Sequence, residues 1–194
     1  MLSRFSAIIL KRIFLTLALI ANAVLLYVIW RGLNIGDTGA NLPEVQRQVG
    51  SHMLIGLGAL TFATFVHAIA LTYFMGTGRF LEETSKAYSL SGEYYIRSQR
   101  LKYGMLPGMT VCLLLMITTG ALGAIADPAT PASLADTFGI TDDWIHFGGA
   151  VVMLGLNLLV TLMEYRAIAG NAQVIEQVLA EVHRIRKERG LPVE

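Results

Sequence analysis

Four long runs of apolar residues, separated by shorter polar segments, dominate the chain. The runs cover about residues 8–31, 53–78, 103–126 and 144–166. Each is long enough for a helix that crosses the hydrocarbon core of a bilayer, which takes about 20 residues. None shows the alternation of apolar and polar residues that is typical of strands in a membrane barrel. The pattern therefore predicts an all-α integral membrane protein, a four-helix bundle made of two helical hairpins.

Composition supports this prediction. The 194 residues are 54% hydrophobic and 15% charged, whereas soluble domains carry about 25% charged residues. Cys112 is the only cysteine, which excludes an internal disulfide framework. The formal net charge of +1 gives no indication of a nucleic-acid partner. The expected environment is the lipid bilayer.

The basic residues predict the orientation. Of the 15 Lys and Arg residues, all except Arg31 and Arg47 lie in the N-terminus, in the loop of residues 79–102 or at and beyond the end of the fourth run. Because cytoplasmic segments are enriched in Lys and Arg, both termini and this loop are expected in the cytoplasm. The expected location is a bacterial-type inner membrane. The first run continues apolar to Trp30, so we interpret it as a retained span rather than a cleaved leader.

The two halves of the chain resemble each other weakly. A shift of 94 positions aligns His52 with His146, and it also aligns Leu60 with Leu154, Gly76 with Gly170, and Glu82 with Glu176. An internal repeat of two parallel hairpins is one interpretation. Shared membrane composition is the other, and the sequence leaves both open.

The segments between and after the spans look like docking elements. Gly76 and Gly78 are expected to end the second helix, as glycine caps do. Residues 1–170 form the predicted bundle, and residues 171–194 form an amphipathic cytoplasmic helix and tail. Its apolar seam has helical spacing and consists of Ile175, Val178, Val182 and Ile185. The tail is expected to extend the fourth helix and to dock against the loop of residues 79–102 or a partner subunit. This loop and the tail of residues 172–189 are the expected contacts with other subunits.

His52 and His146 are candidate axial ligands of a b-type haem. They stand at corresponding ends of the second and fourth spans, and two facing imidazoles are a common way to hold haem iron between helices. Small residues nearby would leave room for the macrocycle: Gly56, Gly58, Gly120, Gly123, Gly148 and Gly149. Ordinary interfacial histidines and close helix packing explain the same residues without a cofactor.

His67 and Glu164 are a second candidate site. By helix rise, His67 lies about 22 Å deeper than His52, and ionisable residues inside a membrane are functional candidates by default. A histidine and an acid at one depth can hydrogen-bond a quinone or exchange protons. The competing interpretation is a structural hydrogen bond between helices. Asn22 and Asn157, near the middle of their spans, are expected to fix helix register.

These residues predict an integral membrane subunit of a larger, electron-transfer type of assembly, with no complete active site of its own. A b-type haem, a quinone and no cofactor at all are the alternatives that the sequence leaves open. The alternative function is a non-redox membrane scaffold or small transporter whose polar residues only organise packing.

Overall fold

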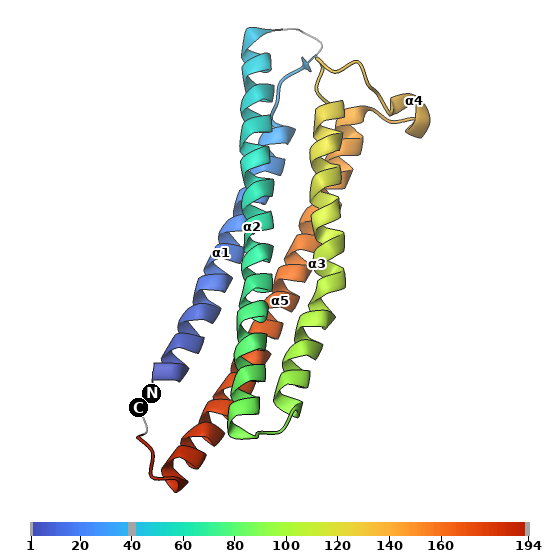
Figure 1. Ribbon diagram of the computed structural model, residues 1–194. Coiled ribbons are helices and arrows are strands. Elements are labelled where there is room, and N and C mark those ends of the chain that lie inside the picture. Colours follow the sequence, from blue (N-terminus) through green and yellow to red (C-terminus); the bar gives the residue numbers. More distant parts are fainter. Residues whose placement is uncertain (1, 39–41, 193–194) are drawn as a thin grey trace. The chain divides into compact units, whose positions relative to one another are not determined.

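The computed structural model describes residues 2–38 and 42–192, with side chains from residue 9 onward. It is 86% helical, and the described residues contain no strand. The helices in chain order are α1 (Leu2–Leu33), α2 (Pro43–Tyr88), α3 (Glu93–Ile125), α4 (Ala135–Phe138) and α5 (Asp142–Glu188), labelled in Figure 1. In the described part of the chain, four helices, α1, α2, α3 and α5, are long and apolar enough to cross a membrane. The all-helical class and the four apolar helices are thus confirmed.

The helices group into two compact units. Unit 1 comprises Met1–Thr16, His67–Pro107 and Thr161–Glu194, and unit 2 comprises Leu17–Val66 and Gly108–Val160. Each unit draws on all four long helices. The two candidate sites therefore fall in different units, with His67 and Glu164 in unit 1 and His52 and His146 in unit 2.

α2 continues well past the glycines that were expected to end it. It is helical through Gly76 and Gly78 to Tyr88, so that prediction is wrong. A Cβ built on Gly78 would lie 3.0 Å from Nε2 of Gln99. A larger residue there would only displace the flexible end of the Gln99 side chain. Packing of the next turn, where Leu81 is buried with Val174 and Val178, holds the helix despite a glycine cost of roughly 1 kcal/mol relative to alanine.

A four-residue turn joins α2 to α3. Ser89 has a left-handed backbone with φ of 55°, and the N–H of Leu90 donates to the carbonyl of Ser85 at 2.9 Å. This is the bond of a Schellman helix end. The N–H of Glu93 then donates to Oγ of Ser91 at 3.2 Å, which caps the start of α3. The short turn makes these helix ends antiparallel neighbours.

The end of α5 packs on α2 within unit 1. Leu81, Val174, Val178 and Val182 form one buried cluster. Tyr88, Leu90, Tyr94 and Ile175 pack against it. The apolar seam of the tail is therefore used inside the chain, against the segment around the α2–α3 turn.

The surface of the long helices is largely apolar, whereas several polar side chains are buried. Leu54, Leu57 and Ile117 are 73%, 66% and 70% exposed, while Asn157 and Glu164 are both 0% exposed. A protein folded in water shows the opposite distribution. Within each unit, the polar residues lie where helices pack together.

Candidate functional site

His52 and His146 lie close together in unit 2, on α2 and α5. Their ring centres are 6.2 Å apart, and the ring planes meet at 84°. The structure thus brings together the two residues that the sequence singled out as candidate ligands. It does so although they are far apart in the chain.

Each of the two imidazoles packs against a glycine of a neighbouring helix. A Cβ built on Gly32 of α1 would lie 3.0 Å from Cε1 of His52. A Cβ built on Gly123 of α3 would lie 3.1 Å from Cε1 of His146. Both distances are shorter than ordinary van der Waals contact, so a larger residue would displace the ring. The same contact therefore occurs in both hairpins: a glycine of one helix packs against the imidazole of a histidine on the following long helix. Gly123 was among the expected small residues, whereas Gly32 was not.

One buried nitrogen of each ring lacks a hydrogen-bond partner, although the His146 ring also has a hydrogen bond with the backbone of Thr119. Nδ1 of His52 and Nδ1 of His146 are buried and make no hydrogen bond to another group of the described chain. Leaving such a group unsatisfied costs roughly 1–3 kcal/mol. An edge-to-face contact, for which 6.2 Å is an ordinary distance, supplies no partner to either nitrogen. A ligand or a water molecule at this position would satisfy them.

The spacing of the rings also fits two ligands of one metal. If nitrogens bind a metal from opposite sides at about 2.0–2.1 Å, with each ring centre about 1.1 Å behind its nitrogen, the centres are about 6.3 Å apart. The observed distance is 6.2 Å. Gly58 and Gly148 are exposed, and nothing lies within 4 Å of a Cβ built on either. Three other glycines that were expected to make room for a macrocycle face side chains instead: a Cβ built on Gly56, Gly120 or Gly149 would lie 3.5, 3.6 or 2.9 Å from Val28, Leu60 or Leu122. The ring spacing, rather than open space beside the glycines, is therefore what suits a haem iron, for which His52 and His146 would supply the two protein ligands.

His67 and Glu164 form a buried pair in unit 1. Nδ1 of His67 lies 2.7 Å from Oε1 of Glu164, and the side chains are 1% and 0% exposed. The second carboxylate oxygen, Oε2, is buried and makes no hydrogen bond within the described chain. Burying two ionisable side chains costs desolvation energy, which apolar residues of similar volume would not require. The pair is therefore a functional candidate.

A polar cluster that the sequence analysis missed lies two helical turns further along α5. Nδ2 of Asn171 donates to Oγ1 of Thr77 at 2.8 Å and to the hydroxyl of Tyr73 at 3.2 Å. The Tyr73 hydroxyl in turn donates to the carbonyl of Ile168 at 3.5 Å. Asn171 follows Glu164 by seven residues, the spacing of one helix face. That spacing is the sequence signal from which the cluster could have been found.

Asn22 and Asn157 bond each other in unit 2. Nδ2 of Asn157 donates to Oδ1 of Asn22 at 2.8 Å, and Sγ of Cys112 donates to Oδ1 of Asn157 at 3.5 Å. The contacts join α1, α3 and α5 through side chains that are 8% exposed or less. This arrangement suits the expected role in helix register.

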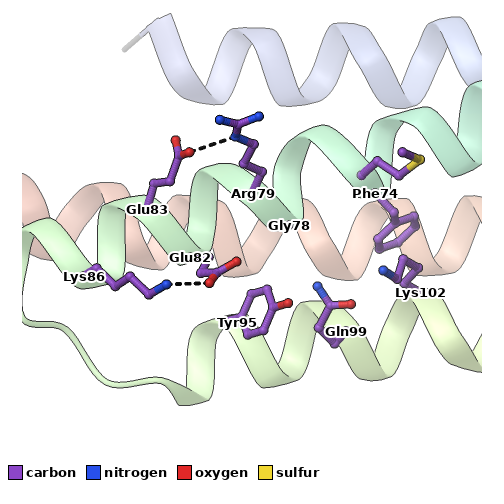
Figure 2. A pocket seen from close by; sticks show the side chains of 10 residues that line it. Phe74, Gly78, Arg79, Glu82, Glu83, Lys86, Tyr95, Gln99 and Lys102 are labelled. Carbon is purple, nitrogen blue, oxygen red and sulfur yellow. Dashed lines mark hydrogen bonds and ion pairs between the residues drawn. The ribbon is translucent and has the colours of Figure 1, made fainter.

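A groove of about 490 Å³ lies between α2 and α3 in unit 1. Figure 2 shows two ion pairs along α2, Arg79 to Glu83 at 2.8 Å and Lys86 to Glu82 at 2.6 Å, with Lys102 of α3 beside them. These pairs have i,i+4 spacing and are exposed, so they mark a solvated helix face. The groove offers no convergent set of chemical groups.

No group of three or more His, Cys, Asp and Glu side chains that could hold a metal ion occurs in the described residues. Comparison of the chain with protein-family models, curated proteins and solved structures finds no match. The function must therefore be argued from the two histidine sites themselves.

Proposed function

We propose that the chain is a four-span integral membrane protein whose His52 and His146 hold a b-type haem. In this role it serves as an electron-transfer subunit of a larger membrane assembly. The observation that carries the proposal is the 6.2 Å spacing of two imidazoles whose buried Nδ1 atoms lack protein partners. The haem supplies one-electron chemistry, and the chain supplies the axial ligands and their positions.

The membrane part of the proposal rests on the apolar helices and their exposed surface. Four helices of sufficient length and hydropathy, with leucines and isoleucines exposed along them, suit a bundle in lipid, where backbone groups must be satisfied within each helix. The Lys and Arg distribution favours termini and an α2–α3 turn on the cytoplasmic side.

The packing around the histidines supports a positioned ligand pair. Gly32 and Gly123 allow the rings to approach α1 and α3, and this contact restricts the orientation of each imidazole. Ring orientation is one of the levers by which a protein tunes haem iron, together with burial and hydrogen bonding. A scaffold whose histidines only fill space does not require both rings to be seated in the same manner.

An absorbance spectrum tests the proposal. The protein, purified in mild detergent from cells supplied with a haem precursor, is expected to give a low-spin reduced-minus-oxidised spectrum with a shifted Soret band and a sharp α band. A well-folded, colourless protein would contradict the haem proposal and favour the alternative, a non-redox scaffold or small transporter. The quinone hypothesis for His67 and Glu164 is a separate prediction that this spectrum does not test.

A further inference from the structure

The His67–Glu164 contact requires a proton between its two atoms. Nδ1 and a carboxylate oxygen at 2.7 Å hydrogen-bond only when one of them carries hydrogen. A neutral imidazole with its hydrogen on Nδ1 can donate to a carboxylate, and the pair then carries a net charge of −1. One further proton makes the pair neutral, either as imidazole with carboxylic acid or as imidazolium with carboxylate. Removing the proton or adding another leaves a net charge on side chains that are 1% and 0% exposed, which is costly in an apolar interior. The pair is therefore a site for a single proton.

Two buried oxygen atoms lie on one face of α5, one in this pair and the other further along the helix. They are Oε2 of Glu164 and Oδ1 of Asn171, and neither makes a hydrogen bond within the described chain. Seven residues separate them, about 10.5 Å at 1.5 Å per residue. Buried polar groups are almost always satisfied, and where protein groups do not do so, ordered water does. These two atoms therefore mark positions that suit water.

The cluster around Asn171 connects this line to the surface of unit 1. Asn171 bonds Thr77 and Tyr73, and both of these residues are half-buried rather than buried. The Tyr73 hydroxyl also reaches the carbonyl of Ile168, which lies between Glu164 and Asn171 on α5. Hydroxyl groups both donate and accept, so they can pass a proton as well as position water.

From these contacts we infer that the His67–Glu164 pair is a proton-binding site that exchanges its proton with the cytoplasmic side through Asn171, Tyr73 and Thr77. The inference rests on the membrane orientation of the proposed function and is independent of the haem. The exchanging species is a proton carried by water, with no redox step. One hydrogen leaves the pair as another enters, so the pair stays neutral.

Cysteine accessibility tests the hydrated route. In a Cys112→Ala background, Asn171→Cys and Val174→Cys place thiols at two buried positions of α5, 0% and 1% exposed in the native chain. Val174 is three residues closer to the end of α5 but lies in the apolar cluster with Leu81. If access follows the polar route, Asn171→Cys reacts with methanethiosulfonate-ethylammonium about tenfold faster, because thiol reactivity follows access to water.

Equal rates, or faster labelling of Val174→Cys, would overturn the hydrated route. Ser89→Cys in the α2–α3 turn is the control for sidedness, because Ser89 is exposed. If Ser89→Cys is labelled only from the opposite side of the membrane, the orientation is wrong. The order of rates at residues 171 and 174 still decides whether the route exists.

Hydrogen–deuterium exchange tests the proton itself. With ¹⁵N-histidine protein in lipid nanodiscs, the ring N–H signal of His67 is assigned by its loss in His67→Gln. Asn171→Leu is expected to slow its exchange in D₂O about tenfold, since the route loses its central polar group. Asn157→Leu is the matched control, because Asn157 is equally buried at 0% exposure on the same helix. An unchanged rate in Asn171→Leu, or equal slowing in both variants, would overturn the inference.

Discussion

Nδ1 of His67 lies 2.7 Å from Oε1 of Glu164, and both side chains are almost completely buried. Because removing one partner leaves the other uncompensated, Glu164→Ala is expected to lower the free energy of unfolding by about 3–5 kcal/mol. Denaturant titration of the protein in detergent micelles measures this value. Glu83→Ala, which removes a carboxylate from an exposed ion pair, is the control and is expected to change stability very little. Equal effects of the two variants would contradict a buried pair.

The glycine beneath His146 provides a test that separates ring positioning from helix stability. Gly123→Ala adds a Cβ 3.1 Å from Cε1 of the ring, whereas Gly58→Ala adds one with nothing within 4 Å. Alanine in a helix is favoured over glycine by roughly 1 kcal/mol, so Gly58→Ala is expected to stabilise the protein by about that amount. Gly123→Ala is expected to stabilise the protein by less than this and to shift its haem spectrum. Identical spectra and thermal midpoints for the two variants would argue against a close contact between Gly123 and the His146 ring.

Two substitutions in the α2–α3 turn are expected to change the stability of the protein in opposite directions. Ser89 holds a left-handed φ of 55°, which glycine adopts without strain, so Ser89→Gly is expected to stabilise the protein by about 1 kcal/mol. Ser91→Ala removes the oxygen that accepts from the Glu93 N–H and is expected to cost about 1 kcal/mol. Thermal unfolding of both variants measures the difference. A stabilising Ser91→Ala would show that the cap is not formed.

The orientation can be tested without a cofactor. Ala132→Cys, in the segment between α3 and α5, is expected to react with an impermeant thiol reagent added outside intact cells, while Ser89→Cys is not. Both residues are exposed, so the contrast reports sidedness rather than burial. The reverse pattern would contradict the orientation drawn from Lys and Arg.

The sequence predicted the helices because the apolar runs are long and almost free of charge. It could not predict that α2 passes through Gly76 and Gly78. Glycine ends a helix only when packing does not hold the next turn, and here Leu81 in that turn is buried against Val174 and Val178 of α5. That contact comes from residues separated along the chain, which local propensity does not register.

The candidate sites were only partly predictable, for a similar reason. Periodicity places His67 and Glu164 at one depth, and the structure adds their 2.7 Å contact. Gly32 and Asn171 were missed because their importance arises from neighbours on other helices. The seam of the tail was expected to dock against the loop or a partner subunit, and Val178 and Val182 are buried against Leu81, which belongs to that loop. Binding of another subunit through the remaining surface of the tail stays a prediction.

The haem content of the purified protein tests the central claim most directly. Pyridine haemochrome assay of the wild type is expected to give one haem per chain, and His52→Ala and His146→Ala are each expected to lose the low-spin spectrum, because each leaves the iron with one protein ligand. His183→Ala, in the tail, and His67→Gln, in unit 1, are expected to retain it. A haem-free wild type that is well folded, or a spectrum that survives loss of His52 and His146, would contradict the account.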